Sequence, residues 1–273
     1  MNSAKLATIE ISYIDRGAGT PAVLLHGFPL DHTMWDAQID ALADRCRVIA
    51  PDLRGFGKSP LGNADPQRGI SMERYADDVA ELLEAIDIRE RVVLVGFSMG
   101  GYIAWQFVRK HAKRLRALVQ CDTKAEADSD EARALRLKMA DQVAEWGSAR
   151  VAEMTGPKML AASSFEMKQS VVEAIRRVIE HTSPAAIAAA QRGMAARPDV
   201  TSLLPTIKVP ALVIVGAEDA ISPPQEMRAI ADTIPGCQFV EIPEAGHMTT
   251  MENPSAVNDA LQDFIKGLRI SSK

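Results

Sequence analysis

One serine of this chain is flanked by glycines in a way that suits nucleophilic chemistry. Ser98 lies in the segment Gly96–Gly100 (GFSMG), between an apolar strand-like run and a helix-like run. A tight turn from strand to helix exposes the serine hydroxyl above the sheet, near the positive end of the helix dipole. The pattern predicts Ser98 as a catalytic nucleophile, although an ordinary glycine-rich turn would have a similar sequence.

A serine hydroxyl needs a general base that accepts its proton, and the chain has five histidines. His247 follows the last strand-like run and precedes the last helix-like segment, so we predict it as the base. His26 ends an early strand-like run and is interpreted as a loop-shaping residue. The other histidines are interpreted as surface or helix-end residues: His32, His111 and His181.

The base in turn needs a carboxylate that orients its ring. Asp219 directly follows the buried run Leu212–Val215, and we predict that it is this acid. Asp122 also follows a strand-like run and is the main alternative. Glu218 is a lesser one.

Acyl transfer also requires donors for the oxyanion that forms on the substrate carbonyl. We expect one donor to be the backbone N–H of Met99, the residue after the nucleophile. The second is expected from the loop that follows an early strand, at the N–H of Phe28. Pro29 has no N–H and is expected to shape this loop.

These residues can lie close together only if the strands that precede them end on the same side of one sheet. Short apolar runs alternate with amphipathic helical segments, which predicts an α/β fold with a mostly parallel, doubly wound sheet. The run Ile9–Ile14 is expected to be an edge strand. Between 124 and 197 no strand-like run occurs, and helices are expected near 129–146, 164–180 and 184–196. We therefore predict a core of 1–123 and 198–273, with 124–197 inserted above the sheet.

Composition narrows the classes of partner. The 273 residues carry a net charge of −5, which argues against nucleic acid and anionic membrane surfaces as partners. The chain has no long apolar N-terminal run that resembles a secretory signal. Three cysteines lie in apolar surroundings and are expected to be buried, reduced thiols of a cytoplasmic protein: Cys46, Cys121 and Cys237. No set of metal ligands is recognised, and neither a metal nor another cofactor is expected.

Five segments in this order resemble α/β-hydrolase-fold serine hydrolases: 26–29 (HGFP), 52–59 (DLRGFGKS), 96–101 (GFSMGG), 216–219 (GAED) and 246–247 (GH). The order Ser98, Asp219, His247 is the order of that fold. Within it the chain is similar to capped bacterial carboxylesterases, enol-lactonases and carrier-protein methyl-ester esterases. The insertion at 124–197 matches the position of their helical cap.

The resemblance implies hydrolysis of small or medium apolar carboxylic esters through an acyl-serine. Haloalkane dehalogenases and epoxide hydrolases of this fold use aspartate where this chain has Ser98, which argues against their chemistry. A lactonase, a carbon–carbon bond hydrolase and a slow-turnover ligand sensor remain open. Pro29 follows the expected oxyanion donor Phe28, and this arrangement is similar to that of cofactor-free haloperoxidases. A side activity that forms peracids therefore also remains open.

The substrate is thus expected to be a small molecule, and the sequence leaves the oligomeric state undetermined. Met, Trp and other apolar side chains near the predicted nucleophile and in the insertion are expected to form the pocket. The predicted pocket residues, besides Phe28, are Phe97, Trp105, Trp146, Met154, Met159, Ile221 and Met248.

Overall fold

A single mixed sheet organises the molecule. The structure is a computed structural model that describes residues 1–270, with the side chains of residues 1–268. Within this part of the chain the strand order is β1-β2-β4-β3-β5-β6-β7-β8. The last six strands in that order are parallel, and β1 and β2 are antiparallel to their neighbours. The strands are β1 (Asn2–Lys5), β2 (Glu10–Gly17), β3 (Thr20–Leu25), β4 (Cys46–Pro51), β5 (Val92–Phe97), β6 (Leu115–Cys121), β7 (Ala211–Gly216) and β8 (Gln238–Ile242).

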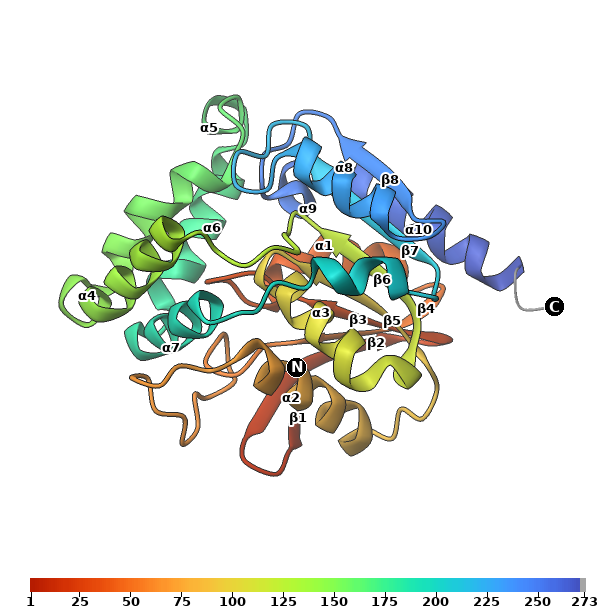
Figure 1. The fold of residues 1–273 in the computed structure, drawn as a ribbon, viewed down its shortest axis with the longest axis horizontal. Helices are drawn as coiled ribbons and strands as arrows, with labels where there is room; N and C mark the ends of the chain where they lie inside the picture. Colours follow the sequence, from red (N-terminus) through yellow and green to blue (C-terminus); the bar gives the residue numbers. More distant parts are fainter. Residues whose placement is uncertain (271–273) are drawn as a thin grey trace.

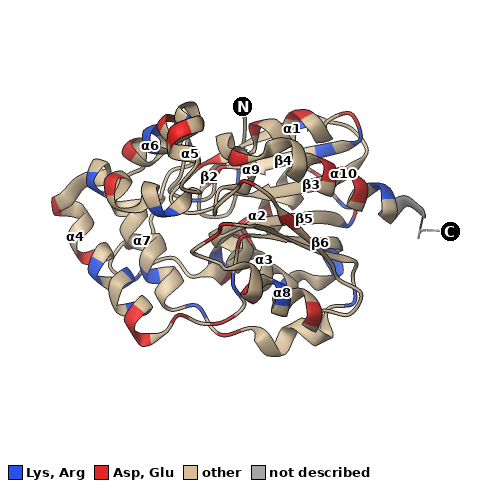
Figure 2. Ribbon diagram, turned by 90° about the horizontal axis from the view of Figure 1, so that it is seen from above, with Lys and Arg blue, Asp and Glu red and all other residues tan. Residues whose placement is uncertain are grey.

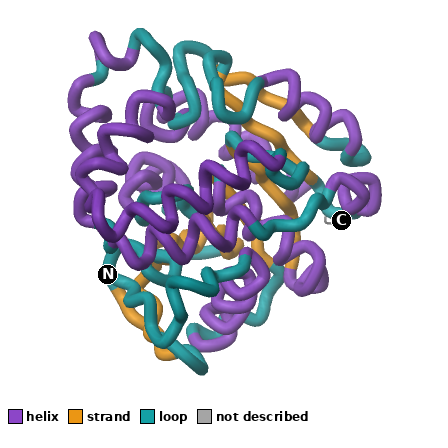
Figure 3. The backbone as a smooth tube through the Cα atoms, turned by 60° about the vertical axis from the view of Figure 1, so that its left-hand side comes forward, coloured by secondary structure: helices purple, strands orange, loops and turns teal. Residues whose placement is uncertain are grey.

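Helices cover both faces of this sheet, so the predicted doubly wound fold is confirmed (Figures 1 and 3). Three helices pack on one face, namely α2 (Met72–Ala85), α3 (Met99–His111) and α8 (Pro224–Thr233). Two others, α1 (Asp36–Leu42) and α10 (Pro254–Ile270), pack on the other face. The remaining α-helices are α4 (Asp130–Thr155), α5 (Ser164–Met167), α6 (Gln169–His181), α7 (Pro184–Ala195) and α9 (Thr249–Glu252).

The alternation of side chains along each strand explains the two helical layers. In β5, Leu94 packs into the cluster beneath α2 and α3, whereas Val93 and Val95 pack into the cluster beneath α1 and α10. All three side chains are fully buried. A strand that is covered on both faces needs apolar residues at every position, because successive side chains point to opposite faces. This is why the buried strands were visible in the sequence as continuous apolar runs.

Four helices are inserted between β6 and β7. These inserted helices, α4 to α7, lie at one end of the molecule, away from the C-terminal end of α10 (Figures 1 and 2). The helix expected near 129–146 forms the first part of α4, and Gly147, at φ 75° and ψ 164°, divides it from a second part up to Thr155 that was not predicted. The helix expected near 164–180 is divided at Lys168 into α5 and α6.

Two predictions about the strands and cysteines are corrected. The run Ile9–Ile14 is not an edge strand, because β2 pairs with both β1 and β4. The edge strand on this side of the sheet is β1, which is too short and polar to be recognised from its residues. Cys237 is partly exposed and precedes β8, whereas Cys46 and Cys121 are buried.

Acidic and basic residues alternate along much of the ribbon in Figure 2. Among the described helices, none is both long enough and apolar enough to cross a bilayer.

A partly buried ion pair between His32 and Asp52 holds the loop that follows β3. His32 Nδ1 lies 2.6 Å from a carboxylate oxygen of Asp52, the residue after β4. Burial alone would lower the pKa of His32, but the hydrogen bond and charge of Asp52 outweigh burial and raise it. Burial alone would raise the pKa of Asp52, but hydrogen bonds from His32 and from the Lys58 amide outweigh burial and lower it. The pair therefore fastens the β3 loop to the end of β4.

The His32–Asp52 pair should stabilise the fold in a pH-dependent way. A raised pKa of His32 gives a stabilisation that is complete below the unfolded-state pKa of about 6.5 and is lost as pH rises through the folded-state pKa. We expect His32→Gln to lower the free energy of unfolding by about 1–3 kcal/mol near pH 5.5 and by less near pH 8.5. Urea denaturation at both pH values measures the difference. His181→Gln is the control, and a His32→Gln deficit that grows with pH would contradict the assignment.

Candidate active site

Ser98 lies in a turn that only small neighbours permit. It follows β5, begins α3 as its N-cap and adopts φ 51° and ψ −112°. A Cβ atom at Gly96 would lie 2.5 Å from the Gly100 carbonyl oxygen, and one at Gly100 would lie 2.2 Å from the Leu25 carbonyl oxygen. Both glycines are therefore required for β5 and α3 to meet at this angle. Positive φ at a non-glycine residue is strained backbone that clusters at functional sites.

The structure brings together Ser98, His247 and Asp219. His247 Nε2 lies 2.9 Å from Ser98 Oγ, and His247 Nδ1 lies 2.8 Å from Asp219 Oδ2. The other oxygen of Asp219 accepts the backbone N–H groups of Ile221 and Ser222. His247 and Asp219 are almost completely buried. Because Asp219 accepts the Nδ1 proton, Nε2 is left free to accept the proton of the serine hydroxyl.

Asp122, the main alternative acid, lies close by but is used differently. Its carboxylate accepts the Gly216 N–H and the Thr249 hydroxyl, and it makes no hydrogen bond to His247. Burial and the neighbouring charge of Asp219 raise the pKa of Asp122 well above its usual range. Asp122 thus fastens the end of β7 to the start of α9. Glu218, the lesser alternative, has an exposed side chain.

Two backbone N–H groups at the site have no hydrogen-bond acceptor among the described residues. Met99 is the first residue of α3, where backbone N–H groups have no acceptor within the helix. Among the described residues neither the Met99 N–H nor the Phe28 N–H donates a hydrogen bond. Gly27 closely approaches Phe97 and Ser98, so the loop that carries Phe28 lies against the nucleophile turn. The two predicted oxyanion donors are thus available on either side of Ser98.

The loop of Phe28 is held from two sides. His26 accepts the Leu53 N–H at Nε2 and contacts the Gly27 carbonyl through Nδ1, as expected for a loop-shaping residue. The Phe28–Pro29 peptide bond is cis. The Pro29 carbonyl accepts the Thr182 hydroxyl from the end of α6 at 3.1 Å. Pro29 therefore connects this loop to the inserted helices.

A cavity of about 190 Å³ opens at Ser98 and His247, beneath the inserted helices. Four predicted pocket residues line it: Phe28, Met154, Met159 and Ile221. Sequence reasoning missed further residues of its wall, because a helix pattern does not reveal which polar side chains turn inward. The missed residues are Pro29, Tyr102, Arg136, Met139, Thr155, Lys158, Gln191 and Met194.

The other four predicted pocket residues do not line this cavity. Phe97 is the last residue of β5, and its ring packs in the cluster beneath α1 and α10, against the rings of Trp35 and His247. Trp105 is buried beneath α3, where its indole N–H donates to the Lys124 carbonyl. Met248 is buried in the cluster beneath α1 and α10. Trp146 lies half-buried just before the break in α4.

Glu252 is a site residue that the sequence analysis did not single out. This buried carboxylate accepts the N–H groups of Gly246 and Met248, the two neighbours of His247. Its other oxygen accepts the Ala161 N–H and the Ser164 hydroxyl, which belong to the inserted region. One side chain therefore fixes both the histidine loop and the segment before α5. Its position five residues after His247 was the signal that could have marked it.

Two groups of side chains have the composition of a metal site. The first consists of Asp31, His32 and Asp52, and the second of Asp122, Asp219 and His247. In both groups the histidine Nδ1 already makes a hydrogen bond to an aspartate of its own group. In each group one carboxylate therefore orients the imidazole, and in the second group it turns Nε2 of His247 toward Ser98.

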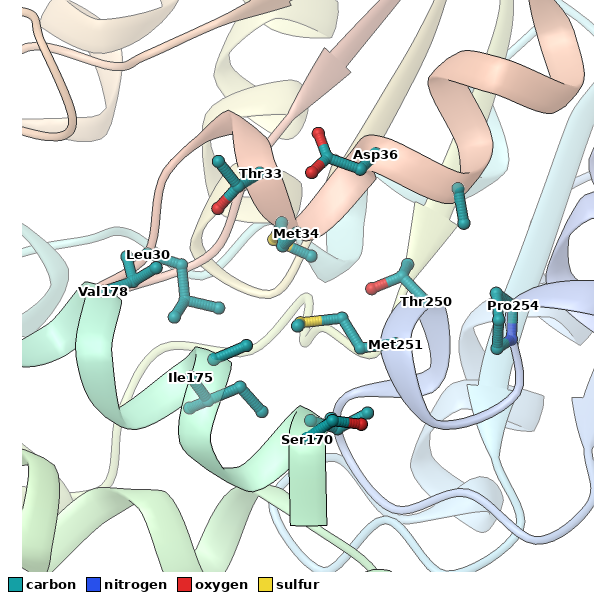
Figure 4. A pocket seen from close by; sticks show the side chains of 13 residues that line it. Leu30, Thr33, Met34, Asp36, Ser170, Ile175, Val178, Thr250, Met251 and Pro254 are labelled. Atoms are coloured by element: carbon teal, nitrogen blue, oxygen red, sulfur yellow. The ribbon is translucent and has the colours of Figure 1, made fainter. Parts of the chain in front are cut away.

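A larger pocket lies outside this site. It measures about 290 Å³ and lies between α6 and the segment that begins α1, with walls such as Met34, Ile175 and Met251 (Figure 4). None of its lining residues lines the cavity at Ser98. Its walls are largely aliphatic and include no histidine, cysteine or basic side chain, so the smaller cavity is the candidate site.

Residues 20–254 match the family model described as the alpha/beta hydrolase fold. The chain belongs to the α/β-hydrolase fold family. Among related proteins, this α/β-hydrolase is 30% identical over 278 residues to a putative non-heme chloroperoxidase of Synechocystis sp., covering 95% of this chain and 96% of that protein.

Solved structures give the same family. A thermophilic esterase from Thermogutta terrifontis, with malate bound, has a TM-score of 0.94 and 45% identity, covering 98% of this α/β-hydrolase and 99% of that chain. The enol-lactonase from Burkholderia xenovorans LB400 has a TM-score of 0.88 and 29% identity. The match covers 97% of this chain and 100% of that chain. The family of this chain is therefore one of hydrolases that includes esterases and a lactonase.

The two aspartates near His247 should differ in their effect on activity. Asp219→Asn should lower kcat by about 10⁴, because an amide at this position favours the wrong tautomer of the imidazole. Asp122→Asn should lower kcat far less, because the hydrogen bonds of Asp122 go to Gly216 and Thr249 and not to His247. Steady-state kinetics on a short-chain p-nitrophenyl ester compares these isosteric variants. A larger loss in Asp122→Asn than in Asp219→Asn would reverse the assignment.

Glu252→Gln should loosen the histidine loop. Its carboxamide places an NH₂ group against backbone N–H donors, so at least one buried donor loses its acceptor. We expect the free energy of unfolding to fall by about 1–3 kcal/mol, measured by urea denaturation. Glu241→Gln, at an exposed position of β8, is the matched control. Equal stability of the two variants would remove this role from Glu252.

Proposed function

We propose that this chain is a carboxylic-ester hydrolase that acts through an acyl-serine intermediate. The observation that carries the proposal is the continuous hydrogen-bonded line from Ser98 through His247 to Asp219. In this line the hydroxyl proton has an acceptor, and the acceptor has a fixed orientation. The two unpaired amides of Phe28 and Met99 support the same reaction, because acyl transfer develops negative charge beside the nucleophile.

The first half of the proposed reaction acylates the serine. Ser98 Oγ attacks the ester carbonyl while His247 Nε2 accepts the hydroxyl proton. The resulting imidazolium is stabilised by the buried carboxylate of Asp219. The carbonyl oxygen becomes an oxyanion, which the N–H groups of Phe28 and Met99 bind, aided by the N-terminal dipole of α3. The tetrahedral intermediate collapses, and the alcohol leaves with the proton from His247.

The second half hydrolyses the acyl-serine. Water enters the position of the alcohol and transfers a proton to His247 as it attacks the acyl carbonyl. Collapse returns the proton to Ser98 Oγ and releases the acid. No step requires a metal or an organic cofactor. We propose that the inserted helices are a cap, since they supply much of the wall of the cavity in which both halves occur.

The relatives favour two substrates for this chemistry. The esterase of Thermogutta terrifontis supports an acyclic ester, and the enol-lactonase of Burkholderia xenovorans LB400 supports a lactone as the second candidate. Both substrates present an acyl carbonyl to the same nucleophile. The identity to the esterase is 45%, against 29% for the enol-lactonase, so the ester is the first choice.

Ser98→Ala should abolish ester hydrolysis while leaving the fold intact. Removal of the triad nucleophile of subtilisin lowers kcat by a factor on the order of 10⁶, and a loss of similar size is expected here. Release of p-nitrophenol from short-chain esters, together with circular dichroism, measures activity and fold. Ser163→Ala removes an exposed hydroxyl that makes no side-chain cap and is the control. Retention of a tenth of the wild-type rate in purified Ser98→Ala protein would refute the proposal.

A further inference from the structure

The Lys and Arg side chains that line the catalytic cavity have no acidic counterpart in its wall. Its lining includes the basic residues Arg136 and Lys158 and no aspartate or glutamate. The chain as a whole has the opposite balance, with a net charge of −5. The cationic lining is therefore a local property of the cavity. A cleft lined by one sign of charge raises the local concentration of ligands of the opposite sign.

Arg136 is held in place by a cluster that carries excess positive charge. Its Nε donates to Asp128 at 2.6 Å, and the other oxygen of Asp128 lies 2.7 Å from Arg197 Nη1. One carboxylate thus faces two guanidinium groups, and one positive charge remains. Arg197 also stacks over Tyr102, another residue of the cavity wall, at 4.2 Å from the ring centroid. The Arg136 guanidinium is consequently fixed before any ligand arrives.

Lys158 adds a second positive charge without a partner. It lies in the short 3₁₀ helix Gly156–Met159, and its side chain is exposed. Among the described residues, no carboxylate forms an ion pair with it. The carbonyl of the adjacent residue Met159 accepts the N–H of Met248, next to the catalytic histidine. The backbone that carries Lys158 is therefore anchored to the reaction centre.

We propose that the substrate carries a carboxylate at the end remote from the scissile bond, as in a monoester of a short dicarboxylic acid. This inference rests on the proposed ester hydrolysis and adds the class of acid. The acyl carbonyl lies at Ser98, the methylene groups contact the methionine and aromatic walls, and the free carboxylate binds at Arg136 and Lys158. Guanidinium and carboxylate groups match in geometry and charge. The cavity of about 190 Å³ limits the acid to a short chain.

The test compares two ethyl esters with the same six-carbon acyl chain, monoethyl adipate and ethyl hexanoate. We define the charge preference as kcat/KM for monoethyl adipate divided by kcat/KM for ethyl hexanoate, with ethanol release as the assay. The wild-type preference should be about tenfold or more, given the size of electrostatic effects in one-sign clefts. It should fall as the salt concentration rises, because ions screen charges at the cavity mouth.

Substitutions locate the source of this preference. Lys158→Glu should reduce it about tenfold or more, and Lys158→Arg should retain it. Arg136→Gln should also reduce it, and thermal unfolding checks that this variant folds. Lys138→Glu makes the same charge change on α4 at an exposed residue that does not line the cavity, so the preference should be unchanged.

Two results would overturn the inference: a wild-type preference for ethyl hexanoate, or an equal effect of Lys158→Glu and Lys138→Glu. Absence of turnover on both esters would instead contradict the proposed hydrolysis. The inference is then decided by calorimetric titration of the Ser98→Ala protein with the two intact esters. Binding of monoethyl adipate about tenfold tighter than ethyl hexanoate supports it, and equal affinity overturns it.

Discussion

The hydrogen bond between Asp219 and His247 is the interaction on which the site depends. A buried carboxylate costs several kcal/mol unless hydrogen bonds compensate for lost water. Asp219 receives three such bonds, from the imidazole and from the backbone N–H groups of Ile221 and Ser222. These bonds require the loop after β7 to curl around the carboxylate and the histidine ring to face it. The ring then has one orientation, in which Nε2 meets Ser98.

Other buried carboxylates near the carboxyl ends of the strands accept hydrogen bonds from the backbone. Asp52 and Glu252 each accept several backbone N–H groups, and Asp122 accepts the N–H of Gly216 at the end of β7; each joins segments that are distant in sequence. Loops at strand ends lack ladder partners for their amides, and an unpaired buried amide is costly. A carboxylate that accepts hydrogen bonds from several amides removes this cost and fixes the loop. The loops of Phe28 and His247 are thereby held around Ser98 on a rigid sheet.

This arrangement separates the two signs of charge. The acids of the site face backbone amides or the imidazole within the protein, while Arg136 and Lys158 line the cavity. The inserted helices supply both basic residues and are themselves fastened to the histidine loop through Glu252 and Met159. The chemistry thus resides on the sheet, and the charge of the cavity comes from the insertion. Substrate choice can vary in this fold with the insertion, without alteration of the reacting groups.

The sequence by itself determined the alternating α/β architecture, the turn of Ser98 and the order of the reacting residues. These features depend on local patterns, since buried strands need continuous apolar residues and the Ser98 turn needs Gly96 and Gly100. Tertiary structure decided which acid meets His247, because Asp122 and Asp219 both follow strands and only side-chain direction separates them. It also decided the cavity wall and the role of Glu252, whose contact with Ala161 spans 91 residues. Such contacts depend on how helices pack across the sheet edge, which local spacing does not encode.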